Sequence, residues 1–124
     1  MKKITLSLAI LGLTLAAQAQ LPIKMEDLSK HIGDSVTVCT KIYGGIYLDH
    51  SKGTPTLLNA GGAYPNAPLT VLLWSDARAQ FKEAPETFFK DKDVCITGKL
   101  ILYKDKPEIV VYEEKQLVLS VNRE

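Results

Sequence analysis

Two stretches of the sequence, VTVCTKIY (residues 36–43) and DVCITGKL (residues 93–100), each set a cysteine among β-branched residues. In both, apolar side chains alternate with polar ones at a period of two, which is typical of a strand with one buried face. Cys39 and Cys95, the two cysteines of the chain, share the parity of the polar residues. We therefore expect both cysteines to point away from the core, on two matching strands.

The remaining segments predict a mostly β chain with few helical residues. Met25, Leu28 and Ile32 recur at helical spacing and predict a short N-terminal helix. The first strand is expected to bend at Gly44 and Gly45, because a glycine pair allows the bulge with which small barrels turn a corner. The expected elements are a helix at 25–33, strands at 35–48, 54–59, 69–74, 93–103 and 107–112, and helical stretches at 77–81 and 85–89.

The order of these elements predicts an all-β fold. Five short strands, of which the first is long and bent, with a helix between the third and the fourth, are the layout of an OB-fold, a five-stranded Greek-key barrel. We predict this barrel, with the helix between strands 3 and 4 and a short N-terminal helix before strand 1. The length allows one domain of this kind and no second one.

The N-terminus has the pattern of a secretory signal. Lys2 and Lys3 precede an apolar run over residues 4–17, and the run closes on the A-x-A site ending at Ala19. We predict that residues 1–19 are a signal peptide and residues 20–124 a single exported domain, periplasmic or secreted. An uncleaved anchor helix is the alternative, although the apolar run is short for a bilayer span.

Removal of the signal peptide changes the charge. The 15 basic residues fall to 13 without Lys2 and Lys3, against 14 acidic ones, so the mature chain is near −1 with histidine neutral. A strongly basic footprint is the usual whole-chain sign of a nucleic-acid binder, and this chain lacks it. Any basic surface must therefore be local.

Three stretches carry a family resemblance: HIGDSVTVCTKIY, TPTLLNAGGAYPNAPLTVLLWSDARAQF and DKDVCITGKLILYKDKPEIVV, which together run from about residue 31 to residue 111. They resemble small secreted bacterial OB-fold domains of the tRNA-anticodon-binding-like group, which includes nuclease-associated proteins. The resemblance implies nucleic-acid binding. The position after the first cysteine is usually glycine in that group and is Thr40 here, so the bend of strand 1 is expected to rely on Gly44 and Gly45.

The cysteines can be placed within this fold, because strands 1 and 4 of an OB-fold are antiparallel neighbours. If Cys39 lies opposite Cys95, the same register pairs Val38 with Ile96 and sets Lys41 opposite the acid at position 93. Directly opposed residues lie at a separation that a disulfide can span, and exported proteins meet an oxidising compartment. We hypothesise a Cys39–Cys95 disulfide, with two half-buried free thiols as the alternative.

Known catalytic and cofactor motifs do not occur. His31 and His50, the only histidines, lie far apart in the sequence, and the cysteines do not form the close pairs of a zinc site. No serine, cysteine or carboxylate lies in a nucleophile motif, and Gly61-Gly62 is not followed by the lysine of a P-loop. We therefore predict a protein that is not an enzyme and has neither a metal nor a cofactor.

Ligand binding by an OB-fold uses the groove over strands 2 and 3, flanked by the loops after strands 1 and 4. Those loops carry lysines, and several aromatic residues lie near them, which is the combination that single-strand binding requires. Each residue also has an ordinary explanation, since Trp74 and Tyr64 could fill the barrel end and loop lysines are often simply solvated. The predicted nucleic-acid-binding residues are Tyr47, Lys52, Tyr64, Trp74, Arg78, Tyr103, Lys104 and Lys106.

These observations favour an exported, non-enzymatic OB-fold module that binds single-stranded DNA or RNA weakly through this groove. Weak binding is expected because phosphate neutralisation supplies most non-specific affinity and the mature chain is near neutral. The alternative is an envelope adaptor domain that binds a protein or a saccharide through the same groove. After signal cleavage no membrane insertion is expected.

Overall fold

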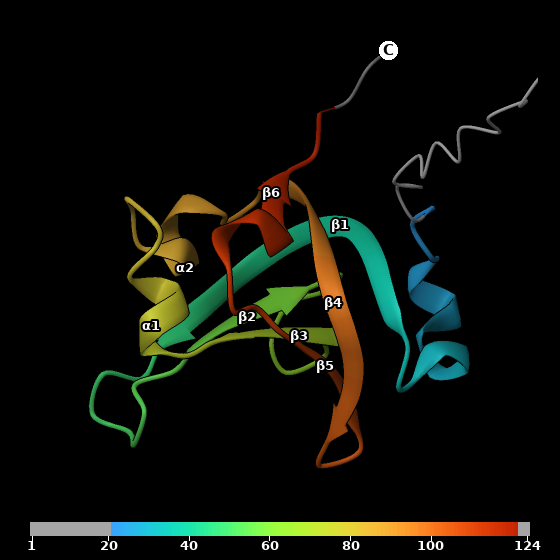
Figure 1. Cartoon of the computed structure of the whole chain (residues 1–124), viewed down its shortest axis with the longest axis horizontal. Coiled ribbons are helices and arrows are strands. Elements are labelled where there is room, and N and C mark those ends of the chain that lie inside the picture. The colour runs from blue at the N-terminus through green and yellow to red at the C-terminus, as the bar shows by residue number, and fades with distance from the viewer. Residues whose placement is uncertain (1–20, 122–124) are drawn as a thin grey trace, which may run out of the picture.

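The computed structural model describes residues 21–121, so the predicted signal peptide lies outside the described residues. Within them the chain is mostly β (Figure 1). No helix among residues 21–121 is both long and apolar enough to cross a membrane. In chain order the elements are η1 (Met25–His31), β1 (Ser35–Tyr47), β2 (Thr56–Ala60), β3 (Leu69–Leu73), α1 (Ser75–Arg78), α2 (Pro85–Phe88), β4 (Asp93–Tyr103), β5 (Lys106–Val110), η2 (Glu114–Gln116) and β6 (Leu117–Leu119).

The strands form a mixed six-stranded sheet in the order β1-β2-β3-β5-β4-β6, with a further pairing of β1 to β4. The first five strands thus pair in a closed circuit, as in a barrel-like fold. The β3–β5 pair is parallel and the other pairs are antiparallel. The order of the first five strands, with helices between the third and the fourth, agrees with the prediction.

The predicted number of strands was wrong, because β6 adds a sixth. It pairs with β4 at Val94↔Leu119, Cys95↔Val118 and Ile96↔Leu117. With three residues, β6 is too short to show an alternating pattern in the sequence. Its position is set by tertiary pairing along β4 and by the single helical turn η2 before it.

Strand β1 bends where the sequence predicted it. The register with β2 shifts between Ile42 and Gly44, which marks a bulge. Gly44 has a φ of 139°, a backbone conformation open to glycine and unfavourable for other residues. At Gly45 a Cβ atom would lie 2.5 Å from the carbonyl oxygen of Leu57, so the two strands approach each other too closely for a side chain there. The bend lets β1 pair first with β4 and then with β2.

The two cysteines form a disulfide, as predicted. The β1–β4 register contains Val38↔Ile96, Cys39↔Cys95 and Lys41↔Asp93, and the sulfur atoms of Cys39 and Cys95 are 2.02 Å apart. Lys41 lies opposite the acid in the register, and its Nζ atom is 5.2 Å from the centre of the Tyr43 ring.

The hydrogen-bond phase of the ladder explains why these positions suit a disulfide. The N–H of Ile42 donates to the carbonyl of Lys92 at 3.0 Å, so every second opposed pair from that point is hydrogen-bonded. Cys39 and Cys95 fall on the alternate, non-hydrogen-bonded positions, where opposed residues approach most closely. Their Cα atoms are 4.0 Å apart.

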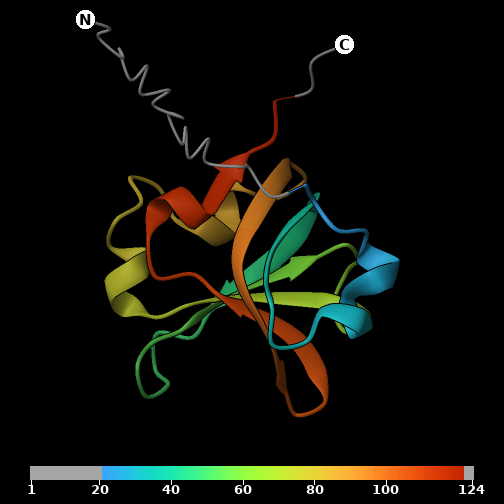
Figure 2. The same ribbon diagram turned by 45° about the vertical axis from the view of Figure 1, so that its right-hand side comes forward.

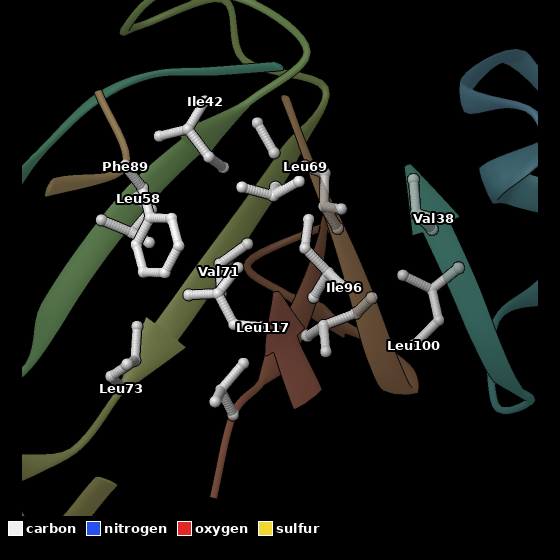
Figure 3. Close-up of a cluster of buried hydrophobic side chains, with 14 of the residues drawn as sticks. Val38, Ile42, Leu58, Leu69, Val71, Leu73, Phe89, Ile96, Leu100 and Leu117 are labelled. Atoms are coloured by element: carbon white, nitrogen blue, oxygen red, sulfur yellow. The ribbon is translucent and has the colours of Figure 1, made fainter. Parts of the chain in front are cut away.

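The core consists of the side chains that point inward from the strands. Figure 3 shows side chains of different strands pointing toward one another, with Phe89, which directly follows α2, beside Leu58. The N-terminal helix is a 3-10 helix that buries Leu28, and Ile23 before it bridges to Val38. The fully buried large side chains are Val38, Ile42, Leu58, Leu69, Val71, Leu73, Val94, Ile96, Leu100, Ile109, Val111 and Leu117.

One position with inward parity is not buried. Leu102 has the same parity as the buried Leu100, but it is 50% exposed. It pairs with Pro107 near the tip of the β4–β5 hairpin, which extends beyond the body of the barrel (Figure 1). The described residues therefore cover only about half of this side chain.

Removing the disulfide is expected to lower the free energy of unfolding by about 3–4 kcal/mol, because the bond restricts a long loop in the unfolded chain. The measurement is urea unfolding of mature protein, with and without reductant, beside the Cys39→Ala/Cys95→Ala variant. Reductant should shift the midpoint of the wild type and leave the double variant unchanged. Equal stability of the oxidised and reduced wild type would contradict the expectation.

Candidate functional site

The strand register places two rows of side chains on the outer surface of the barrel. The first row is polar: Asn59 of β2 lies opposite Thr70 of β3, which lies opposite Glu108 of β5. Neighbouring strands are about 4.8 Å apart, so the three residues span about 10 Å. The second row is apolar and contains Ile46, Leu57, Leu72 and Val110. We call these two rows, with Ile101 opposite Glu108 on β4, the outer face.

Glu108 is the unusual member of the outer face. It is 7% exposed, although it has the outward parity of its strand, and β5 lies between β3 and β4. Burial raises the pKa of its carboxyl group above the ordinary value of 4.5. No cation among residues 21–121 forms an ion pair with it. The centre of this face therefore offers an uncompensated hydrogen-bond acceptor.

Two aromatic residues from the predicted set extend the outer face at its ends. Trp74 follows Leu72 at a spacing of two in extended backbone, so it has the outward parity. It is 42% exposed, and its ring packs on Gly53 of the β1–β2 loop. Tyr103 has the parity of Ile101 and is 58% exposed. The expectation that Trp74 could be buried in the barrel end is not met.

Lysines flank both ends of the outer face. Lys106 lies opposite Tyr103 and two residues before Glu108, so it has the outward parity. Lys104 lies at the hairpin tip with its Nζ atom 5.5 Å from the centre of the Tyr103 ring. Lys52 lies in the β1–β2 loop, and this green loop and the orange β4–β5 hairpin extend from the same side of the barrel in both views (Figures 1 and 2).

The charges around the outer face nearly balance. The three lysines at its ends are offset by Asp49 and Asp105 in the same loops and by Glu108 in the centre, and all but Glu108 are exposed. Three positive and three negative side chains together attract a polyanion only weakly. The local charge thus repeats the near neutrality calculated for residues 20–124.

Arg78 has a structural role at the barrel end. Its Nη1 atom donates to Thr56 Oγ1 at 2.7 Å and to Glu86 Oε2 at 2.8 Å. Its guanidinium lies 3.6 Å from the centre of the Tyr47 ring. The hydrogen bond that Arg78 donates to Glu86 is the main cause that raises the pKa of Arg78 above its ordinary value, so the side chain stays charged. These contacts join β1, β2, α1 and α2.

The structure divides the predicted residues into three groups. Tyr47, Lys52, Trp74 and Arg78 lie at one end of β2 and β3, since Thr56 pairs with both Tyr47 and Leu73. Tyr103, Lys104 and Lys106 lie on the β4–β5 hairpin. Tyr64 is 81% exposed in the β2–β3 loop, at the opposite end of β2 from Trp74, where Gly61 contacts Met25 of η1. It therefore lies apart from the group around Trp74.

Asn59, Thr70 and Glu108 were missed from the sequence. The alternation of β2 and β3 predicts that Asn59 and Thr70 face outward, and this signal was available. Finding the row also requires the parallel β3–β5 pairing, which joins segments about forty residues apart and leaves no local signature.

A hollow of about 650 Å³ lies elsewhere, between the α1–α2 segment and β6. Its lining is largely apolar, with Phe81, Phe88, Leu117 and Leu119, and charged residues at positions 82, 83, 114 and 115. None of the predicted binding residues lines it. Strand β6 has β4 on one side only, so its other edge faces this region.

Comparisons with known proteins show a likeness of fold. No family model and no curated protein matches the chain. A solved structure described as an aspartyl-tRNA synthetase from Leishmania major Friedlin is similar, with a TM-score of 0.51 and 9% sequence identity. The match covers 87% of this chain and 23% of the other. At this identity the likeness shows the fold alone, and this chain corresponds to less than a quarter of that protein.

Replacing Arg78 with methionine is expected to lower the free energy of unfolding by about 3 kcal/mol, because Glu86 would remain largely buried without its partner. The side chain of Glu86 is 14% exposed, and its Oε1 atom has no hydrogen-bond partner in the described part of the chain. Urea unfolding of Arg78→Met, Glu86→Gln and the double variant measures the coupling. A loss no larger than that of the exposed control Lys90→Met would contradict this role.

Replacing Glu108 with glutamine is expected to raise the melting temperature at pH 7 by a few degrees. Burial raises the pKa of Glu108 in the folded state, so its contribution to stability is complete below pH 4.5, the ordinary value, and declines as the pH rises through the folded value. The gain should disappear when both proteins are compared below pH 4. Thermal unfolding against pH tests this, with exposed Glu83→Gln as the control. A gain independent of pH would contradict the assignment.

Proposed function

We propose that the domain is an OB-type barrel that binds single-stranded or oligonucleotide nucleic acid weakly, as an exported module without enzymatic activity. The observation that carries the proposal is the arrangement of the outer face, which has Trp74 at one end, Tyr103 at the other and lysines on the two loops beside them. An exposed aromatic ring offers a stacking surface to any base, and the lysines offer contacts to the phosphates between bases.

The fold supports this proposal. The circuit β1-β2-β3-β5-β4 with helices between β3 and β4 is the arrangement of the OB-fold, whose strand 2–3 face binds oligonucleotides and oligosaccharides. The fold likeness to a protein named as a tRNA synthetase points the same way. The disulfide supports export, since such bonds persist in oxidising compartments.

Binding without catalysis is proposed from the chemistry of the outer face. Glu108 lies between Thr70 and Ile101 in the register. Hydrolysis of a phosphodiester or an ester generally requires an activated nucleophile with a base and an orienting group beside it. One carboxylate between a threonine and an isoleucine lacks that arrangement, but it can accept hydrogen bonds from a ligand.

The proposal predicts salt-sensitive binding of short single strands. Oxidised mature protein should bind fluorescent DNA and RNA oligomers at low salt, with a change in Trp74 emission. Replacing both Lys104 and Lys106 with glutamine should reduce the slope of log K against log salt by roughly 0.7 per lysine. The double variant Lys82→Gln/Lys90→Gln, with the same change in net charge away from the outer face, is the matched control.

Two results would contradict this prediction. One is the absence of any signal at low salt with all oligomers. The other is an equal loss of binding in the two lysine double variants, which would show a non-specific charge effect and not binding at the outer face.

A neutral saccharide is the second candidate ligand. It is favoured by the polar row of Asn59, Thr70 and Glu108, which offers hydrogen bonds without a net positive charge. Binding of a neutral oligosaccharide, insensitive to salt and lost in Trp74→Ala, together with no oligonucleotide binding, would favour this ligand class.

A further inference from the structure

The proposed nucleic-acid binding has a consequence for base selectivity, because the row Asn59–Thr70–Glu108 has an order of hydrogen-bonding groups. The three residues are consecutive across β2, β3 and β5 in the register. From one end they offer an amide, a hydroxyl and a carboxylate. An amide and a hydroxyl can each donate, whereas an ionised carboxylate can only accept.

The carboxylate at one end of this row is complementary to the amino group on the pairing edge of cytosine. That edge presents an amino group that donates and then two acceptors, N3 and O2. Thymine and uracil present an acceptor, O4, at the position of the amino group. A base whose pairing edge lies beside Glu108 would thus bring a hydrogen-bond donor to the carboxylate if it is cytosine, and an acceptor if it is thymine.

We propose that Glu108 is a specificity-determining residue that accepts a hydrogen bond from the amino group of cytosine, so that the outer face prefers cytosine to thymine or uracil in a single strand. The inference rests on the proposed nucleic-acid binding.

The energetic reason lies in the burial of Glu108. It is 7% exposed, and burial raises the pKa of its carboxyl group. A largely buried acceptor has lost part of its solvation, which a hydrogen-bond donor of the ligand can replace. A ligand acceptor in the same place would displace the remaining water and supply no hydrogen bond to the carboxylate. The preference therefore has two sources, a hydrogen bond gained with cytosine and solvation of Glu108 lost with thymine.

The test compares oligo-dC with oligo-dT of about eight nucleotides, a length within the site size of one OB-fold. The two have equal backbone charge and similar ring size. Titrations at low salt and pH 7.5 use wild type, Glu108→Gln and the exposed control Glu83→Gln. We expect the wild type and the control to prefer dC by about tenfold. In Glu108→Gln the preference should fall to within about twofold, chiefly through tighter binding of dT.

A second measurement needs no variant. An oligomer in which every cytosine carries two methyl groups on N4 keeps the ring and loses the donor, so wild type should bind it no better than dT. Equal binding of dC and dT, or a preference that persists in Glu108→Gln, would overturn the inference and leave the proposed function standing. If wild type binds no oligomer, the proposed function fails and the inference fails with it.

Discussion

The structure depends on strand β1 being shared between two neighbours. Its first half pairs with β4 and its second half with β2, and without this shared strand the circuit of five strands would remain open. Two features hold it. The glycine pair at the bend allows a bulge and a close approach to β2, and the disulfide joins the first half to β4 at a position where the ladder has no hydrogen bonds. The second feature strengthens the ladder where backbone bonding is absent.

Closure also fixes which residues face outward. Side chains alternate with a period of two, so a slip of one residue in any pair would turn the core outward. The register that opposes the cysteines is the one that buries Val38 and Ile96. The pairings of β1 with β2, β2 with β3 and β3 with β5 keep the same alternation of inward and outward side chains. As a result Asn59, Thr70 and Glu108 lie in one outward row. The outer face and the core are thus two consequences of one register.

The sequence predicted what depends on local pattern. Alternation around Cys39 and Cys95 predicted both strands. Their register followed from the expected OB-fold, in which strands 1 and 4 are neighbours, because opposing the cysteines also pairs the apolar residues and sets Lys41 opposite an acid. Gly44 and Gly45 gave the bend for the same local reason. Strand β6 and the row through Glu108 arise from tertiary neighbours that are distant in the sequence, so no window contains their signal. Arg78 was grouped with the binding residues by residue type, whereas its partners on β2 and α2 give it a structural role.

The charge of the outer face limits what it can do. Lysines at both ends would favour any nucleic acid, but acids in the same loops reduce that attraction, so the proposed binding would not rest on phosphate contacts alone. Its other sources of affinity would be stacking on Trp74 and Tyr103 and hydrogen bonds to the polar row. A buried and unpaired carboxylate lowers stability at neutral pH, and a threonine or glutamine at position 108 would avoid this loss. A ligand with a donor at that point supplies the partner that the protein lacks, so the same residue that weakens the free barrel would favour one kind of ligand.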